Sequence, residues 1–99
     1  MQAWYVVRTK TGQEPTAKYH LQRQGFTVYF PRIYADSRKS TKKPEALFPG
    51  YQFIHLSDQE GDWSVIRSTI GVIGLVKFGD KPASIADSII EHLIARENE

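Results

Sequence analysis

The segment from Tyr51 to Leu56 constrains the fold most, because large side chains alternate along both of its faces. As a β-strand it presents Tyr51, Phe53 and His55 on one face and Gln52, Ile54 and Leu56 on the other. A strand with apolar side chains on both faces needs cover on both sides, so we predict a central strand of a sheet. Either the chain's own elements provide all of this cover, or part of the apolar surface is left as a docking pocket for a partner.

Further strands and helices are expected on either side of this segment. Three strands rich in β-branched and aromatic residues are expected at residues 3–9, 26–34 and 72–78. Three helices are expected at residues 16–24, 63–69 and from Ser84 onward, where Ser84 and Asp87 resemble a capping box. The order β-α-β-β-α-β-α predicts an α+β fold, a four-stranded antiparallel sheet flanked by helices, of the split-βαβ kind.

The length and the residue types bound what such a chain can do. Ninety-nine residues leave room for one domain, residues 1–99. The absence of cysteine excludes disulfides and thiolate chemistry, the three histidines are far apart in sequence, and no nucleophile elbow is present. We therefore expect no enzyme activity, no metal and no cofactor. No apolar run approaches the ~18 residues of a membrane-spanning helix, so a cytoplasmic location is expected.

Charge is distributed unevenly along the chain. Residues 1–43 carry nine Lys and Arg against two carboxylates, a net charge of +7, whereas residues 44–99 carry a net charge of −5. This asymmetry favours a basic surface that meets a polyanion, including a basic loop over residues 36–44. If the first helix packs back on the first strand, Lys10, His20 and Arg23 line one surface, and these residue types suit phosphate and base contacts on nucleic acid. Solvated side chains without a ligand are the alternative.

The strand that begins at Tyr51 is also consistent with an RNA-binding surface. Gly50 to Leu56 partly matches the sequence pattern of the RNA-recognition motif, with Pro49 in place of the basic residue and Gln52 in place of the small one. Trp4 or Tyr5 on the first strand would then offer a second stacking platform. An RRM-like domain that binds single-stranded RNA is therefore one hypothesis for this chain.

Several short motifs, taken together, carry a family resemblance. They are Trp4-Tyr5-Val6-Val7, His20-Leu21 with Arg23-Gln24, Leu47-Phe48-Pro49-Gly50-Tyr51, and Val76-Lys77-Phe78-Gly79. From Met1 to about Leu93 the chain resembles the N-terminal (NGN) domain of NusG-type transcription factors, most of all the RfaH-type antitermination branch. The resemblance implies a non-enzymatic elongation factor that keeps the RNA polymerase clamp closed and reduces pausing. The family usually carries a C-terminal KOW domain, which these residues do not contain.

The resemblance also implies partners and the residues that contact them. A hydrophobic pocket of the family receives the clamp helices of the largest polymerase subunit, and the matching residues here are Phe48, Tyr51, Phe53, Ile90 and Leu93. In the RfaH branch an opposite basic surface reads the non-template DNA strand, and the matching residues are Lys10, His20, Arg23 and Gln24. Asp62-Trp63-Ser64 stands where that branch contacts the gate loop of the second-largest subunit with a His-Thr-Thr patch, and Arg8 replaces an aromatic residue at the pocket edge. A monomer is expected.

Overall fold

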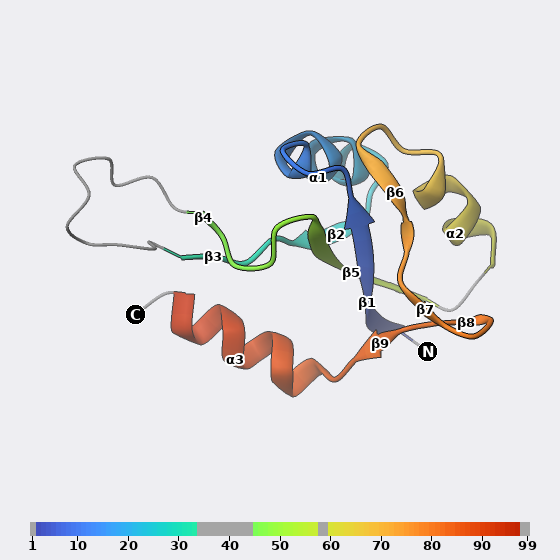
Figure 1. Cartoon of the computed structure of the whole chain (residues 1–99). Helices are drawn as coiled ribbons and strands as arrows, with labels where there is room; N and C mark the ends of the chain where they lie inside the picture. The colour runs from blue at the N-terminus through green and yellow to red at the C-terminus, as the bar shows by residue number, and fades with distance from the viewer. Residues whose placement is uncertain (1, 34–44, 58–59, 98–99) are drawn as a thin grey trace.

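A sheet separates two layers of helix in the computed structural model, which describes residues 2–33, 45–57 and 60–97 (Figure 1). The sheet contains β1 (Gln2–Thr9), β2 (Thr27–Tyr29), β5 (Tyr51–Ser57), β6 (Val72–Leu75) and β9 (Ser84–Ile85). The helices are α1 (Glu14–Arg23), α2 (Glu60–Arg67) and α3 (Asp87–Glu97). Two small hairpins stand apart from the sheet, one made of β3 (Arg32–Ile33) and β4 (Glu45–Ala46), the other of β7 (Lys77–Phe78) and β8 (Lys81–Pro82). The predicted α+β class with an antiparallel sheet is confirmed.

The sheet is built around the pairing of β1 with β5. Its strand order is β2-β5-β1-β6, so β5 is internal, as its two apolar faces predict. The far edge of β1 is shared by two strands, because β6 pairs with its end at Thr9 and β9 pairs with Trp4 and Tyr5. The sheet therefore has five strands, one more than the four expected.

The main core lies between one face of the sheet and helices α1 and α2. Ala17 and Leu21, four residues apart on α1, are both fully buried there, and Ile66 of α2 joins them. The sheet contributes alternate residues of its strands to this core: Tyr5, Val7, Val28, Ile54, Leu56 and Val72. The apolar faces of the helices and of the strands thus pack together in one layer. Burial of this layer is the main source of folding energy in a domain of this size.

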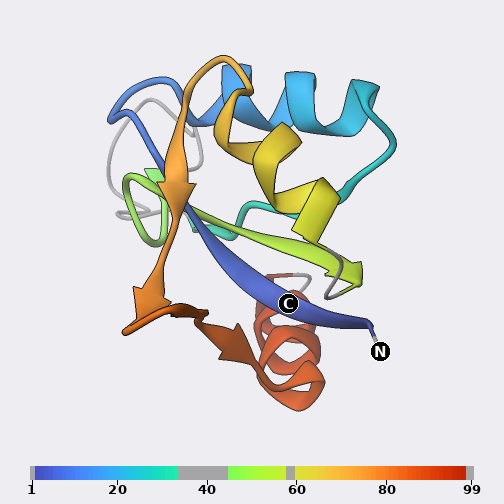
Figure 2. The same ribbon diagram turned by 90° about the vertical axis from the view of Figure 1, so that its right-hand side faces the viewer.

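The third helix covers the opposite face of the sheet. Figure 2 shows α3 below the sheet and α1 above it. On this lower face Trp4 and His55 are cross-strand partners whose ring centroids lie 4.9 Å apart. Ile90 of α3 is buried but lies outside the main core cluster. One face of β5 therefore packs in the main core, and its other face lies on the side of the sheet where α3 is found.

Three predicted segments differ from the structure, each for a local reason. The expected strand 26–34 is broken at Pro31, which has no N–H for a ladder, so β3 pairs separately with β4. The expected strand 72–78 divides after Leu75, and β7 pairs with β8 instead of continuing along β1. The expected capping box at Ser84 is wrong, because Ser84 and Ile85 pair with the open edge of β1 and α3 begins at Asp87. The predicted basic loop at 36–44 lies outside the described residues.

Gly71 should be the least replaceable glycine at the junction of α1 and the sheet. Its φ of 87° suits glycine, and an added Cβ would lie 3.1 Å from the backbone nitrogen of Ala17. Gly25 has a similar φ of 95° but open space around it, so Gly25→Ala is a matched control. We expect Gly25→Ala to lower the free energy of unfolding by about 1–2 kcal/mol, the backbone cost alone, and Gly71→Ala to lower it by more. Urea unfolding measures both, and equal losses would contradict the packing argument.

Candidate functional site

Three aromatic side chains form a continuous row on the α3 side of the sheet. The ring of Phe53 on β5 stacks on Tyr29 of β2 at 6.3 Å and meets the edge of Phe48 at 6.1 Å. We call Tyr29, Phe53 and Phe48 the aromatic row. Phe53 is 8% exposed, whereas Phe48 is 41% exposed, and Tyr51, on the same face of β5 as Phe53, is 39% exposed. The aromatic row is therefore buried at its centre, at Phe53, and exposed to solvent at the Phe48 end.

The turn before β5 presents the two exposed aromatic side chains. The N–H of Tyr51 donates to the carbonyl of Phe48 at 3.1 Å, and the N–H of Leu47 donates to the carbonyl of Pro31 at 2.9 Å. Gly50, with a φ of 83°, lets the chain reverse into β5. Phe48 and Tyr51 thus stand on a hydrogen-bonded turn and not on a free loop.

Helix α3 adds a wall beside the aromatic row. Leu93, with Tyr29 of the row, helps to line a pocket of about 500 Å³ between α3 and two short segments, residues 29–32 and Leu47. The other lining residues are Pro31, Arg32, Leu47, His92, Arg96 and Glu97. Ile90, by contrast, is only 1% exposed. Of the two helix residues singled out in the sequence, Leu93 therefore faces a pocket, and Ile90 is packed inside.

A carboxylate fastens the end of α3 to the sheet. Glu97 accepts a hydrogen bond from the backbone N–H of Arg32 at 2.6 Å and another from the hydroxyl of Tyr29 at 3.4 Å. Burial and the nearby charge of Glu97 raise the pKa of Tyr29 from 10.0 to about 12. The position of α3 beside the aromatic row therefore depends on a contact between residues far apart in the sequence.

A second candidate surface lies on the α1 side. His20, Arg23 and Gln24 line one pocket of about 380 Å³ together with Ser68, Thr69 and Ile70 from the segment after α2. The side-chain amide of Gln24 donates to the Thr69 hydroxyl at 2.9 Å and to the carbonyl of His20 at 3.0 Å. The predicted DNA-contacting residues of α1 are thus brought together, and Gln24 is held in place from both sides.

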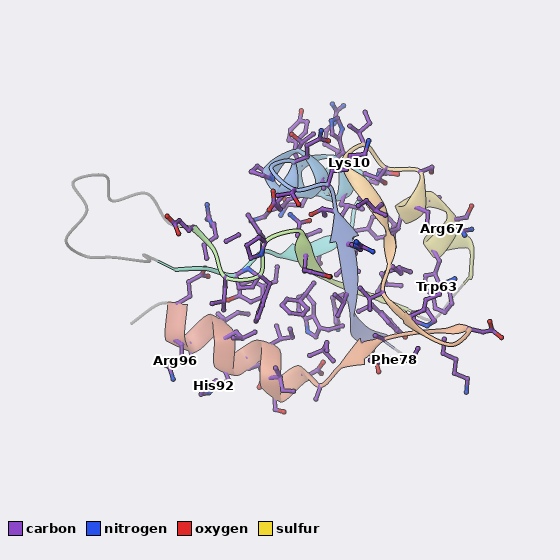
Figure 3. The ribbon with its side chains drawn as sticks, viewed as in Figure 1. Lys10, Trp63, Arg67, Phe78, His92 and Arg96 are labelled. Carbon is purple, nitrogen blue, oxygen red and sulfur yellow. The ribbon has the colours of Figure 1, made fainter. Side chains whose placement is uncertain are left out.

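Lys10 and Tyr19 lie next to this pocket without lining it. The N–H of Lys10 donates to the carbonyl of Gly71 at 2.9 Å, so the backbone of Lys10 lies beside the 68–71 segment. The guanidinium of Arg23 lies 5.7 Å from the centre of the Tyr19 ring and donates to its hydroxyl at 3.4 Å. We call Lys10, His20, Arg23 and Gln24 the basic surface. Figure 3 shows Lys10 on the opposite side of the molecule from His92 and Arg96 of α3.

Sequence reasoning missed residues at both surfaces. Tyr29 belongs to the aromatic row only because β2 pairs with β5, a partnership that strand patterns alone do not reveal. Thr69, which lies 45 residues from Gln24 in the sequence, and its neighbour Ile70 also reach the basic surface. The one sequence feature that pointed to this segment was an apolar residue, Ile70, directly before Gly71. Trp63, at the expected gate-loop position, is partly buried and lies edge-on to Tyr5 at 6.1 Å.

The domain thus has two separate candidate surfaces, one aromatic and one basic. In the part of the chain that the structure describes, no three His, Asp or Glu side chains are grouped as metal ligands would be. Within the same ranges no helix combines the length and apolar character needed to cross a bilayer.

The chain belongs to the NusG family. The family model described as transcription termination factor NusG matches residues 2–94. This family consists of transcription factors and not of enzymes. Membership confirms the resemblance to NusG-type factors, whereas the relatives named below carry the general NusG name and not that of the RfaH-type branch.

Two curated relatives and one solved structure illustrate the likeness. The transcription termination/antitermination protein NusG of Thermus thermophilus is 34% identical over 92% of this chain and 59% of its own length. That of Bacillus subtilis is 30% identical over 94% of this chain and 61% of its own length. A solved structure that concerns domain interaction in Thermotoga maritima NusG superposes with a TM-score of 0.73 at 25% identity, covering 95% of this chain and 56% of that one. The chain thus spans about three fifths of the length of these relatives.

The contact between Tyr29 and Glu97 predicts a pH dependence. Because the pKa of Tyr29 is raised in the folded state, the protonated phenol stabilises the fold fully below pH 10.0, and this contribution is lost as the pH rises toward about 12. The stability of the natural chain relative to Tyr29→Phe should therefore fall across that window. Glu97→Gln should move the titration of Tyr29 back toward its ordinary range. Urea unfolding at a series of alkaline pH values measures the difference, and a constant difference would contradict the assignment.

Proposed function

We propose that this domain binds RNA polymerase through the aromatic row with Tyr51, and contacts the non-template DNA strand through the basic surface. The observation that carries the first part is the pair of aromatic side chains, Phe48 and Tyr51, that remain about two-fifths exposed on a hydrogen-bonded turn. The partner is the tip of the clamp helices of the largest subunit, as the family resemblance implies. Bound there, the domain keeps the clamp closed, reduces pausing and acts in antitermination, as a monomer in the cytoplasm.

The chemistry of the aromatic side suits a helical partner. Aromatic residues supply large contact areas at low entropic cost, and they are the usual anchors of protein interfaces. The buried Phe53 supports the exposed Phe48 from below, while Phe48, Tyr51 and Leu93 offer contact area to the partner. A helix tip laid against such a surface buries its own apolar residues in the same way.

The basic surface supports recruitment by DNA of the RfaH type. A cation, an imidazole and an amide line a single pocket, and residues of these types hydrogen-bond to the edges of unpaired bases. The exposed Ile70 adds apolar area to the same pocket. Because α1 and α3 lie on opposite sides of the sheet, polymerase and DNA can be bound at the same time (Figure 2).

The RNA-binding alternative is less well supported. An RRM-like domain stacks bases on exposed aromatic side chains of its sheet. Here Phe53 is buried by its aromatic neighbours, and the ring of Trp4 lies against His55. Tyr51 alone among the aromatic residues of β5 is open enough to stack, and NusG family membership favours a polymerase partner.

Tyr51→Ala should weaken binding to core RNA polymerase by at least thirtyfold, roughly 2 kcal/mol, because it removes an exposed aromatic anchor of the surface. Tyr19→Ala is the matched control, since Tyr19 is also an exposed tyrosine but lies on α1. Binding is measured with the purified chain in competition with a NusG N-terminal domain. Retained affinity in a folded Tyr51→Ala variant would contradict the proposal that this surface binds RNA polymerase.

His20→Ala and Arg23→Ala should each cost about 1–3 kcal/mol of sequence-dependent recruitment, the scale of one good base contact. The assay uses reconstituted elongation complexes whose non-template strands differ in sequence. Lys81→Ala, which removes a charge from the β7–β8 hairpin, controls for general electrostatics. Equal losses on every strand sequence would mean that these residues contact only the DNA backbone.

A further inference from the structure

Glu14 is a buried carboxylate that neither proposed surface uses. It is the first residue of α1 and shares the inward face of that helix with Ala17 and Leu21. Its side chain is only 6% exposed. Burying a carboxylate is costly unless hydrogen bonds compensate for lost hydration. The contacts of Glu14 should therefore show what its burial achieves.

Those contacts lie on both sides of Tyr51. The Oε2 of Glu14 accepts a hydrogen bond from the backbone N–H of Gly50 at 3.1 Å. Its backbone carbonyl accepts another from the side-chain amide of Gln52, which is itself fully buried. The two residues that flank Tyr51 are thus both tied to the start of α1.

Gly50 is held at both of its backbone polar groups. Its N–H meets Glu14, and its carbonyl accepts a hydrogen bond from the N–H of Thr9 at 2.8 Å. Gly50 also has a φ of 83°, a conformation that few residues would share. Without the carboxylate, the buried N–H of Gly50 would lose its partner, and the turn could relax around this glycine.

We propose that Glu14 is a positioning residue for the polymerase-binding surface, acting by holding the 47–50 turn so that Phe48 and Tyr51 are ordered before the partner arrives. The inference rests on the proposed function, because it assigns a role toward the same partner. Side chains that are already ordered lose less entropy on binding, so the turn contributes to affinity without touching the polymerase. The reach of the Glu14 side chain, rather than its charge, is the property that matters.

Two substitutions separate reach from charge. Glu14→Asp keeps the negative charge, which suits a helix N-terminus, but shortens the side chain by one methylene. Glu14→Gln keeps the length and an oxygen acceptor but removes the charge. Both variants keep a polar side chain in the first turn, so both should fold. Ala17→Gly, on the same face of α1, is a control that lowers stability without a hydrogen bond to Gly50.

The experiment compares affinity for core RNA polymerase with hydrogen exchange at the Gly50 amide. Glu14→Asp should weaken binding about tenfold, the scale of ordering one or two side chains, and speed exchange at Gly50. Glu14→Gln should stay within about twofold of the natural chain in both measurements, since its acceptor still reaches the amide. Ala17→Gly should leave the affinity unchanged.

The inference is overturned if Glu14→Asp binds as the natural chain does, if Glu14→Gln loses as much affinity as Glu14→Asp, or if Ala17→Gly loses as much affinity as Glu14→Asp. Failure of the proposed function has a different signature. In that case Tyr51→Ala would also keep its affinity, while exchange at Gly50 would still respond to Glu14→Asp. Loss of binding in Tyr51→Ala with full binding in Glu14→Asp would refute the positioning role alone.

Discussion

The antiparallel register between β1 and β5 decides which side chains of these two strands face α3 and which face the main core. Val6 is paired with Phe53 and Arg8 with Tyr51, so these residues face α3, while Tyr5 and Ile54 face α1 and α2. A slip of one residue would exchange the two faces, placing aromatic anchors in the core and core residues on the surface. The core residues on the α1 side oppose such a slip, because a shifted register would expose their apolar side chains to water and lose hydrophobic stabilisation.

Each candidate surface forms where this sheet brings together segments that are distant in the chain. Tyr29 meets Phe53 across β2 and β5, Glu97 closes the end of α3 onto Arg32, and Gln24 meets Thr69 across the basic surface. The sheet lies between α1, which carries His20 and Arg23 of the basic surface, and α3, which lies beside the aromatic row. One domain can therefore present two unlike chemistries, an apolar aromatic surface and a basic polar one, on separate sides of its sheet.

Local patterns predicted the elements that this register organises, but not the contacts between them. The alternation along residues 51–56 identified β5 as the central strand, because the period of a strand follows from its backbone geometry. Ser84 misled because a Ser three residues before an Asp suits a helix start, whereas the open edge of β1 offered a strand partner that only the folded sheet creates. Tyr29 and Glu14 were overlooked for the same reason. Their roles depend on which strand or turn lies opposite, and a charged residue on a helix is by default assigned to solvent.

A docking surface must be exposed and yet keep one shape, and the two requirements conflict for apolar side chains, which tend to collapse onto one another in water. In this domain buried residues hold the exposed aromatic side chains in place. Phe53 is fixed by aromatic contacts on both sides, and the exposed Phe48 rests against it. Tyr51 is held through its neighbours, since Gly50 and Gln52 bond to Glu14 on the opposite side of the sheet. Directional hydrogen bonds in the interior thus set the geometry of an apolar surface, which non-directional hydrophobic packing alone would leave less defined.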